Sequence, residues 1–192
     1  MDFKSFKLVQ TNMSAQRYVY EGYKTENGIH LEYYISTENW DNTTLGYAEN
    51  RNTVRVIDGD EKLFGELCAL FGNCRIGEWG NFSGYDSQAL DGTGMSFKAV
   101  LADGTEINAN GTNSFPKNFS VFAQKLHKLI TTEKINSVKF SDGTFEITLP
   151  ESWVGTVNAS YSEDYVAFYV DKTDGSDLTF FIIDNNINGY SS

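Results

Sequence analysis

Few side chains in this 192-residue chain have the types and spacing that catalysis requires. His30 and Glu32 are two residues apart in an alternating stretch, so they would share one face of a strand. A histidine beside a carboxylate can act as a general base, although an exposed strand histidine is the simpler interpretation. No serine or cysteine stands in a nucleophile-elbow sequence, and no glycine run matches a phosphate-binding loop. The sequence therefore indicates no assembled catalytic set.

The chain also lacks the spacing of a metal site. Cys68 and Cys74 are six residues apart, and neither His30 nor His127 has a ligand-like spacing to them. A disulfide between the two cysteines is one interpretation, and a pair of buried thiols is the simpler one. We expect neither a bound metal nor another cofactor.

Aromatic residues with polar neighbours occur in two segments, the polar stretch 37–52 and the glycine-rich connector 75–92. Flat rings can stack on a sugar or a peptide side chain while amides and carboxylates orient it. The predicted ligand-binding residues are Trp40, Tyr47, Trp79, Asn81, Tyr85 and Asp86. The competing interpretation is that Trp79 and Phe82 anchor a long connector on the core.

Three hypotheses of function follow from these segments and from the net charge of −11. The first is a non-catalytic binding module that recognises a protein or carbohydrate partner. The second is a hydrolase that uses carboxylates such as Asp86 and Asp91 in a cleft near Trp79. The third is an acidic immunity or inhibitor protein that covers a basic toxin. The sequence leaves open whether the protein is an enzyme.

Charge and hydropathy argue against two kinds of partner. A net charge of −11 repels phosphate backbones, and we see no basic patch, so nucleic acid is not an expected partner. No apolar run approaches transmembrane length, and the start of the chain lacks the apolar region of a signal peptide. We expect a cytoplasmic protein if Met1 is the native start, and a secreted or cell-surface one if a leader has been removed.

The stretch 90–130 organises the predicted fold. Apolar residues alternate over 95–101 and again over 105–109, which predicts the two strands of a hairpin. A two-residue Asp-Gly turn would mix the two faces, because a slip of one residue turns every side chain over. A three-residue loop with Gly104 in the left-handed region places Ala99 opposite Ile107, so we predict that loop.

A helix is predicted directly after this hairpin, over 116–130. Asn113 or Ser114 would cap it, and Pro116 would lie in its first turn. One apolar stripe at helical spacing should face the sheet, namely Phe119, Phe122, Leu126, Leu129 and Ile130.

The remaining elements are read from alternation, turn residues and caps. Asp60 should cap a helix that ends at Gly72 or Asn73, and residues 37–52 should form a loop. Strands are predicted at 3–10, 18–24, 29–36, 53–57, 138–140, 145–149, 154–161, 165–171 and 178–183. The fold class is therefore α+β: an antiparallel sheet of hairpins with two helices packed on one face, followed by a C-terminal antiparallel β meander. We assign residues 1–133 to an α+β domain and 134–192 to a β-rich extension packed on it.

Two sequence patterns carry a resemblance. The first runs from Trp79 and Phe82 through the Asp-Gly pairs at 91–92 and 103–104 to Gly-Thr-Asn-Ser-Phe-Pro-Lys-Asn-Phe at 111–119. The second is Leu-Pro-Glu-Ser-Trp at 149–153. The chain resembles uncharacterised protein families of Gram-positive, largely gut-dwelling bacteria that carry these patterns. The resemblance implies a bacterial origin and no known activity.

Overall fold

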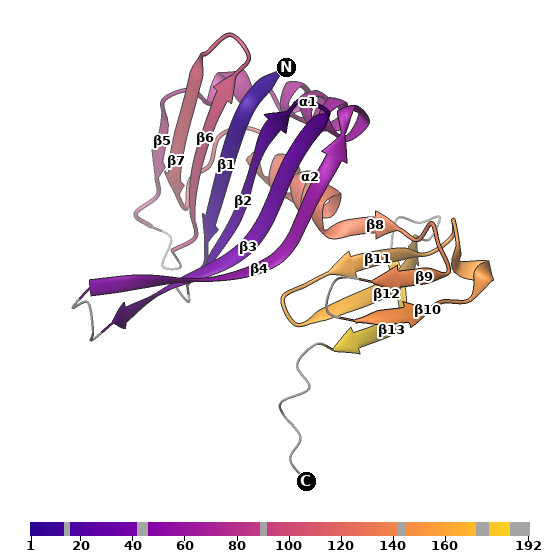
Figure 1. Ribbon diagram of the computed structural model, residues 1–192. Coiled ribbons are helices and arrows are strands. Elements are labelled where there is room, and N and C mark those ends of the chain that lie inside the picture. The colour runs from indigo at the N-terminus through magenta and orange to yellow at the C-terminus, as the bar shows by residue number, and fades with distance from the viewer. Residues whose placement is uncertain (14–15, 42–45, 89–91, 142–144, 172–176, 185–192) are drawn as a thin grey trace. The chain divides into compact units, whose positions relative to one another are not determined.

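The computed structural model describes residues 1–13, 16–41, 46–88, 92–141, 145–171 and 177–184. Within these ranges the side chains of residues 39–41, 46–48, 177, 180 and 184 lie outside the description. The chain divides into two compact units, residues 1–130 and 131–192 (Figure 1). Each unit is described by itself, and the packing of the C-terminal part on the first stays a prediction.

Seven strands form the sheet of the first unit, in the spatial order β4-β3-β2-β1-β6-β7-β5 (Figure 1). Neighbouring strands are antiparallel except β5 and β7, which run parallel. The strands are β1 (Phe3–Thr11), β2 (Arg17–Thr25), β3 (Gly28–Asp41), β4 (Gly46–Asp60), β5 (Phe82–Tyr85), β6 (Gly94–Leu101) and β7 (Glu106–Thr112). The helices are α1 (Glu61–Asn73), the 3-10 helix η1 (Ile76–Trp79) and α2 (Phe119–Thr131). The predicted α+β class, with two helices on one face of an antiparallel sheet, is confirmed.

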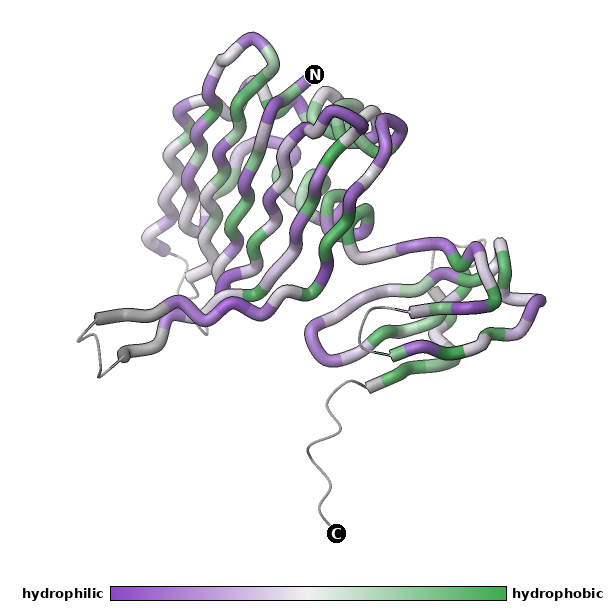
Figure 2. The backbone as a smooth tube through the Cα atoms, viewed as in Figure 1, coloured by the Kyte–Doolittle hydropathy of each residue, from purple (hydrophilic) through white to green (hydrophobic). Residues whose placement is uncertain are grey.

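The central hairpin has the predicted register. Ala99 of β6 pairs with Ile107 of β7, and Phe97 pairs with Ala109. The N–H of Gly104, which has a φ of 90°, donates to the carbonyl of Leu101 at 3.0 Å. Hydrophobic and hydrophilic residues alternate along the strands (Figure 2), and the apolar set packs in the core beneath the helices.

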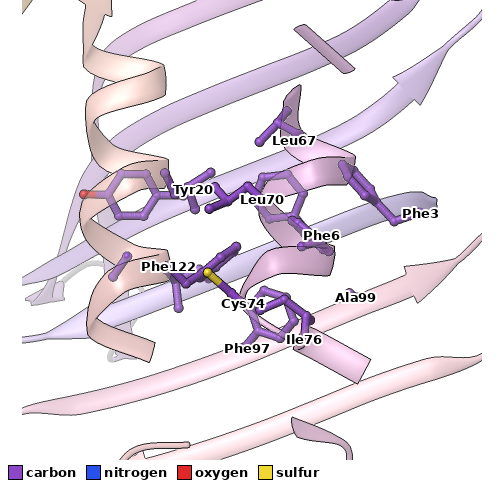
Figure 3. Close-up of a cluster of buried hydrophobic side chains, with 14 of the residues drawn as sticks. Phe3, Phe6, Tyr20, Leu67, Leu70, Cys74, Ile76, Phe97, Ala99 and Phe122 are labelled. Atoms are coloured by element: carbon purple, nitrogen blue, oxygen red, sulfur yellow. The ribbon is translucent and has the colours of Figure 1, made fainter. Parts of the chain in front are cut away.

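Aromatic rings fill the core between this face and the helices (Figure 3). Phe119 is 6% exposed and Phe122 is fully buried, as the apolar stripe predicts. The ring of Phe122 meets that of Phe71 on α1 edge-on, with centroids 5.4 Å apart. Cys68 and Cys74 belong to the same core as free, buried thiols. Burial raises the pKa of both thiols.

The start of each helix can be compared with the prediction. Asp60 caps α1, because its carboxylate accepts from the N–H of Leu63 at 3.0 Å. The predicted start of the second helix is wrong: α2 begins at Phe119, after Asn118 in the left-handed region (φ 65°). Pro116 instead precedes the helix, and its carbonyl accepts from the N–H of Phe119 at 3.1 Å.

The predicted loop at 37–52 is also wrong, because most of this stretch is strand. β3 continues to Asp41 and β4 starts at Gly46, so the two form a long ribbon. Polar residues without alternation look like a loop in sequence, but a ribbon with water on both sides needs no apolar face. Among the described residues, neither helix is long and apolar enough to cross a membrane.

The second unit contains a four-stranded antiparallel sheet, in the order β13-β12-β11-β8, and a separate hairpin of β9 and β10. Its elements are β8 (Thr132–Lys134), β9 (Lys139–Ser141), β10 (Glu146–Thr148), the 3-10 helix η2 (Glu151–Trp153), β11 (Asn158–Tyr161), β12 (Tyr165–Asp171) and β13 (Asp177–Asp184). β11, β12 and β13 follow one another as the predicted meander. Phe140 of the hairpin meets Phe168 of β12 edge-on at 5.1 Å, so both sheets contribute to one core.

Candidate functional site

The face of the first sheet opposite α1 and α2, here called the open face, gathers polar side chains from distant parts of the chain. It consists of the alternate residues that the helix-covered core does not use: Ser5, Lys7, Val9, Thr11, Arg17, Val19, Glu21, Tyr23, His30, Glu32, Tyr34, Ser36, Gly94, Ser96, Lys98 and Val100. Although this face is not part of the core, Val19 is only 2% exposed and Tyr34 only 3%. Two hollows lined by these side chains indent the face.

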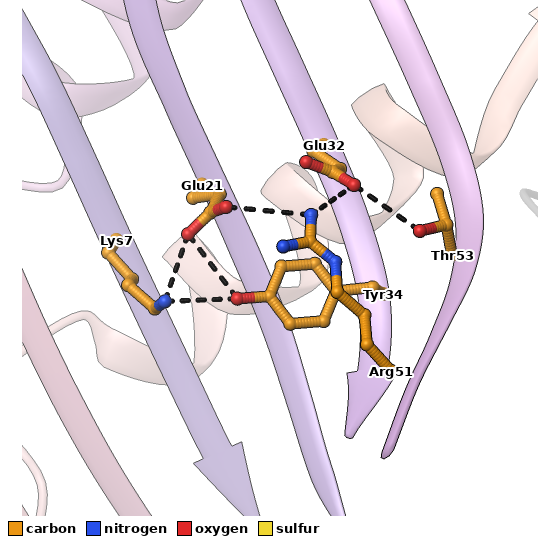
Figure 4. A network of polar contacts seen from close by, with 6 residues as sticks. All are labelled: Lys7, Glu21, Glu32, Tyr34, Arg51 and Thr53. Atoms are coloured by element: carbon orange, nitrogen blue, oxygen red, sulfur yellow. Dashed lines mark hydrogen bonds and ion pairs between the residues drawn. The ribbon is translucent and has the colours of Figure 1, made fainter. Parts of the chain in front are cut away.

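A network of charged side chains crosses the middle of the open face (Figure 4). The Lys7 ammonium lies 3.0 Å from both the Tyr34 hydroxyl and a Glu21 carboxylate oxygen. Arg51 of β4 ion pairs with Glu32 and approaches Glu21 at 3.7 Å. Its guanidinium carbon lies 3.6 Å from the centroid of the Tyr34 ring, a cation–π contact. Four strands thus fix these side chains in position.

The network also sets the electrostatics of Lys7. Partial burial alone would lower its pKa, but hydrogen bonds to Tyr34 and Glu21 and the charge of Glu21 outweigh burial and raise the pKa. Lys7 therefore stays an ammonium at neutral pH. It can donate to a ligand but cannot act as a base there.

On one side of the network lies a hollow of about 480 Å³, here called the Ser36 hollow. Its lining comprises Lys7, Val9, Thr11, Arg17, Val19, Tyr34, Ser36, Glu49, Gly94, Met95, Ser96, Asn110, Gly111 and Thr112. Ser36 is 1% exposed, and its hydroxyl oxygen has no hydrogen-bond partner among the described residues. Its register partners are two arginines, Arg17 and Arg51. A buried hydroxyl without a partner is rare, and this oxygen is enclosed by protein atoms rather than exposed to the hollow.

On the other side lies a hollow of about 410 Å³, here called the Tyr23 hollow. Its lining comprises Ser5, Phe6, Lys7, Glu21, Gly22, Tyr23, His30, Glu32, Lys98, Ala99 and Val100. The Tyr23 ring is 53% exposed and stacks on the His30 ring, with centroids 4.9 Å apart. His30 bonds Asp58 of β4 at 2.7 Å through Nδ1, so its ring is held in place. This pair presents an exposed aromatic surface at the edge of the hollow.

The sequence-predicted site residue Trp79 lies inside the core. It is 2% exposed, and its ring meets those of Phe97 and Phe122, each with centroids 5.3 Å apart. Its indole N–H donates to the carbonyl of Lys117 at 3.0 Å. This geometry matches the alternative interpretation, in which Trp79 anchors the connector, because an enclosed ring offers no face for stacking.

The other predicted residues of the connector lie at the β5 edge of the sheet. Asn81 has a positive φ of 62°, and its N–H donates to the carbonyl of Asn108 at 2.9 Å. Tyr85 is 75% exposed, and the carboxylate of Asp86 accepts from the N–H of Gln88 at 2.9 Å. None of the three connector residues lines either hollow. Their role in binding stays a prediction.

The remaining predicted site residues are far from these in the sheet order. Trp40 and Tyr47 are register partners on β3 and β4, at the opposite edge from β5, and their side chains lie outside the description. Asp91, the second carboxylate of the hydrolase hypothesis, also lies outside the described residues. Among the described residues, no cluster of three or more histidine, cysteine or acidic side chains could hold a metal ion.

His127 of α2 contacts the hydroxyl of Tyr20 through Nδ1 at 2.9 Å, on the helix-covered side of the sheet. Partial burial lowers the pKa of His127 below its usual 6.5, so the unfolded chain takes up this proton at a higher pH than the folded one does.

We expect the first unit to lose stability as the pH falls below about 6.5, because protonation of His127 favours the unfolded chain. His127→Gln should remove this part of the loss. Urea unfolding of the wild type and the variant at pH 7.5 and 5.5 measures how much the free energy of unfolding falls in each. An NMR titration that gave folded His127 a pKa at or above 6.5 would contradict the prediction.

Sequence reasoning missed the open-face set for a physical reason. Alternation correctly puts His30, Glu32 and Tyr34 on one face of a strand, which is the only local signal for this site. Their neighbours Lys7 and Arg51 come from the strands that precede and follow this hairpin, and Arg51 lies in the stretch 37–52, which the sequence predicts as a loop.

Searches of protein-family models, of curated proteins and of solved structures find no match to this chain, so the resemblance to bacterial families stays a prediction and the candidate site stands on its geometry alone.

Proposed function

We propose that the first unit is a non-catalytic binding module whose open face binds a neutral carbohydrate. The observation that carries the proposal is the pair of hollows, about 480 and 410 Å³, on either side of an ordered polar network. Ligand sites are typically concave, of this size, and contain a few fixed polar groups. Hydroxyl and amide side chains such as Thr11, Ser96 and Asn110 line one of them and can bond to such a ligand.

The position of the hollows favours a carbohydrate over an extended peptide. Peptides that bind sheets usually add a strand at an exposed edge, where backbone N–H and C=O groups are free. Most of the lining of both hollows instead comes from β1, β2, β3 and β6, which have a neighbour on each side; only Glu49 of the Ser36 hollow belongs to the edge strand β4. Only side chains are available there, and hydroxyl, amide, ammonium and carboxylate groups suit the many hydroxyls of a sugar.

The charges of the lining favour a neutral ligand. The Ser36 hollow has Lys7 and Arg17 against Glu49, and the Tyr23 hollow has Lys7 and Lys98 against Glu21 and Glu32. Most of these charges are already paired, as in the contact between Lys7 and Glu21 at 3.0 Å. A strongly charged ligand would have to break such pairs, whereas a neutral hydroxyl can bond to them as they stand.

The experiment measures binding of the full chain to cellotetraose, xylotetraose, mannotetraose and maltotetraose by calorimetry. Tyr23→Ala should weaken binding of the saccharide that binds, because it removes a ring contact worth about 0.5–1.5 kcal/mol, roughly a two- to twelvefold loss of affinity. Tyr85→Ala is the matched control, since both rings are exposed tyrosines but only Tyr23 lines a hollow.

The two variants distinguish a site on the open face, which the structure suggests, from a site at the β5 edge, which the sequence predicts. If Tyr85→Ala weakens binding and Tyr23→Ala does not, the β5 edge is the site and the open face is not. If none of the saccharides binds, the proposal is wrong.

A hydrolase is the second candidate, because Glu21 and Glu32 are register partners and line the same hollow. A glycosidase needs one of two such carboxyl groups to carry a proton. Glu21 and Glu32 already pair with the cations of Lys7 and Arg51, so neither carboxylate is free to meet a substrate, and we rank binding first. Product analysis of the same saccharides after incubation decides between them: cleavage that Glu21→Gln abolishes would establish the enzyme.

A further inference from the structure

The two hollows are arranged end to end along the strands. β1 contributes Ser5 and Lys7 to the Tyr23 hollow, and then Lys7, Val9 and Thr11 to the Ser36 hollow. These are consecutive residues of one face with no position skipped, and Lys7 belongs to both hollows.

The same continuity holds on three neighbouring strands. From the Tyr23 hollow to the Ser36 hollow, each strand contributes four successive residues of the open face. They are Tyr23, Glu21, Val19 and Arg17 on β2; His30, Glu32, Tyr34 and Ser36 on β3; and Val100, Lys98, Ser96 and Gly94 on β6. The hollows are therefore two parts of one trough that runs parallel to the strands.

The length of the trough follows from strand geometry. Ser5 and Thr11 are six residues apart, and a strand rises about 3.3 Å per residue, so the trough is roughly 20 Å long. That length is far greater than one sugar ring and fits a short linear chain of rings. The network around Lys7 lies at its middle, where it separates two places for binding.

Building on the proposed function, we propose that the ligand is a linear neutral oligosaccharide that lies along β1 and occupies both hollows at once. Tyr23 supplies the stacking surface at one end, and polar side chains of the lining, such as Ser96 and Asn110, supply hydrogen-bonding groups at the other. Lys7 donates to the part of the chain that crosses between them.

The first test is the dependence of affinity on chain length. Joining two subsites makes the second contact intramolecular, so affinity should rise at least about tenfold from the disaccharide to the tetrasaccharide and then level off. The measurement is calorimetry with the series from two to six sugar units of the saccharide that binds. Equal affinity for the disaccharide and the tetrasaccharide would overturn the inference while leaving the proposed function standing, and no binding at any length would overturn both.

The second test blocks one hollow at a time. Ser96→Trp fills the Ser36 hollow and Val100→Trp fills the Tyr23 hollow, both from half-buried positions on β6. Ser96→Trp should lower tetrasaccharide affinity to the level of the disaccharide, and Val100→Trp should weaken both. Asn108→Trp is the control, because Asn108 is half-buried on the neighbouring strand β7 and lines neither hollow.

Far-UV circular dichroism establishes that each variant is folded before its affinity is compared. A tryptophan at Asn108 that reduces affinity as much as one at Ser96 would overturn the placement of the ligand in the trough.

Discussion

Trp79→Ala is expected to lower the free energy of unfolding of the first unit by about 3–5 kcal/mol, the usual cost of deleting a large buried aromatic side chain. The ring of Trp79 is 2% exposed and contacts Phe97 and Phe122, so its loss leaves a cavity between sheet and helix. It also leaves the carbonyl of Lys117 without its donor. Urea unfolding followed by far-UV circular dichroism gives the change, because this signal does not depend on the deleted indole.

Tyr85→Ala is the control for this prediction. Tyr85 comes from the same connector and is 75% exposed, so its loss should change the free energy of unfolding by no more than about 0.5 kcal/mol. Trp79→Phe is a milder variant that keeps one six-membered ring and removes the N–H donor with the rest of the indole, at a cost of at least about 1–3 kcal/mol. If Trp79→Ala were as stable as the wild type but bound saccharide poorly, the ring would be a ligand contact rather than an anchor.

Gly28→Ala should produce the second large effect, a loss of at least about 1–3 kcal/mol from backbone strain alone. Gly28 begins β3 with a φ of 147°, a conformation that side chains rarely adopt. A Cβ atom there would come within 2.1 Å of the carbonyl oxygen of Gly59 and 2.4 Å of the carbonyl carbon of Asp60. Both are backbone atoms of β4 where it leads into α1, so neither can move without distorting the sheet.

Gly65→Ala is the matched comparison, because the same substitution is expected to raise stability there rather than lower it. Gly65 lies in α1, where an added Cβ would meet nothing within 4 Å. Alanine there should stabilise the helix by about 0.5–1 kcal/mol, because it restricts the unfolded chain more than glycine does. Thermal unfolding of both variants tests the pair. Equal melting temperatures would mean that the turn before β3 tolerates a side chain and that the close approach to β4 is absent.

The parts of the fold that follow from local pattern could be predicted from the sequence. The pairing of Ala99 with Ile107 follows from side-chain alternation, because the wrong loop length would have put apolar residues in water. The burial of Phe122 follows from helical spacing in the same way. The cap at Asp60 needs only its own carboxylate and the N–H of Leu63, three residues away.

The candidate site could not be predicted in this way, because its geometry depends on which strands become neighbours. Lys7 reaches Glu21 and Tyr34 only because β1 lies beside β2, and β2 beside β3. Trp79 is one of the aromatic residues that suggested a binding site in the sequence, but its ring is buried in the core. The hydroxyl of Ser36 has no sequence signature, since its burial comes from its register between Arg17 and Arg51.

The buried thiols of Cys68 and Cys74 are poorly placed to react with oxidants. Burial raises the pKa of each thiol, so little thiolate is present at neutral pH, and thiolate is the form that oxidants and alkylating reagents attack. The sulfur atoms act as small apolar groups within the core and crosslink nothing. The packing around these two thiols would therefore be the same in glutathione-buffered and in aerated solution.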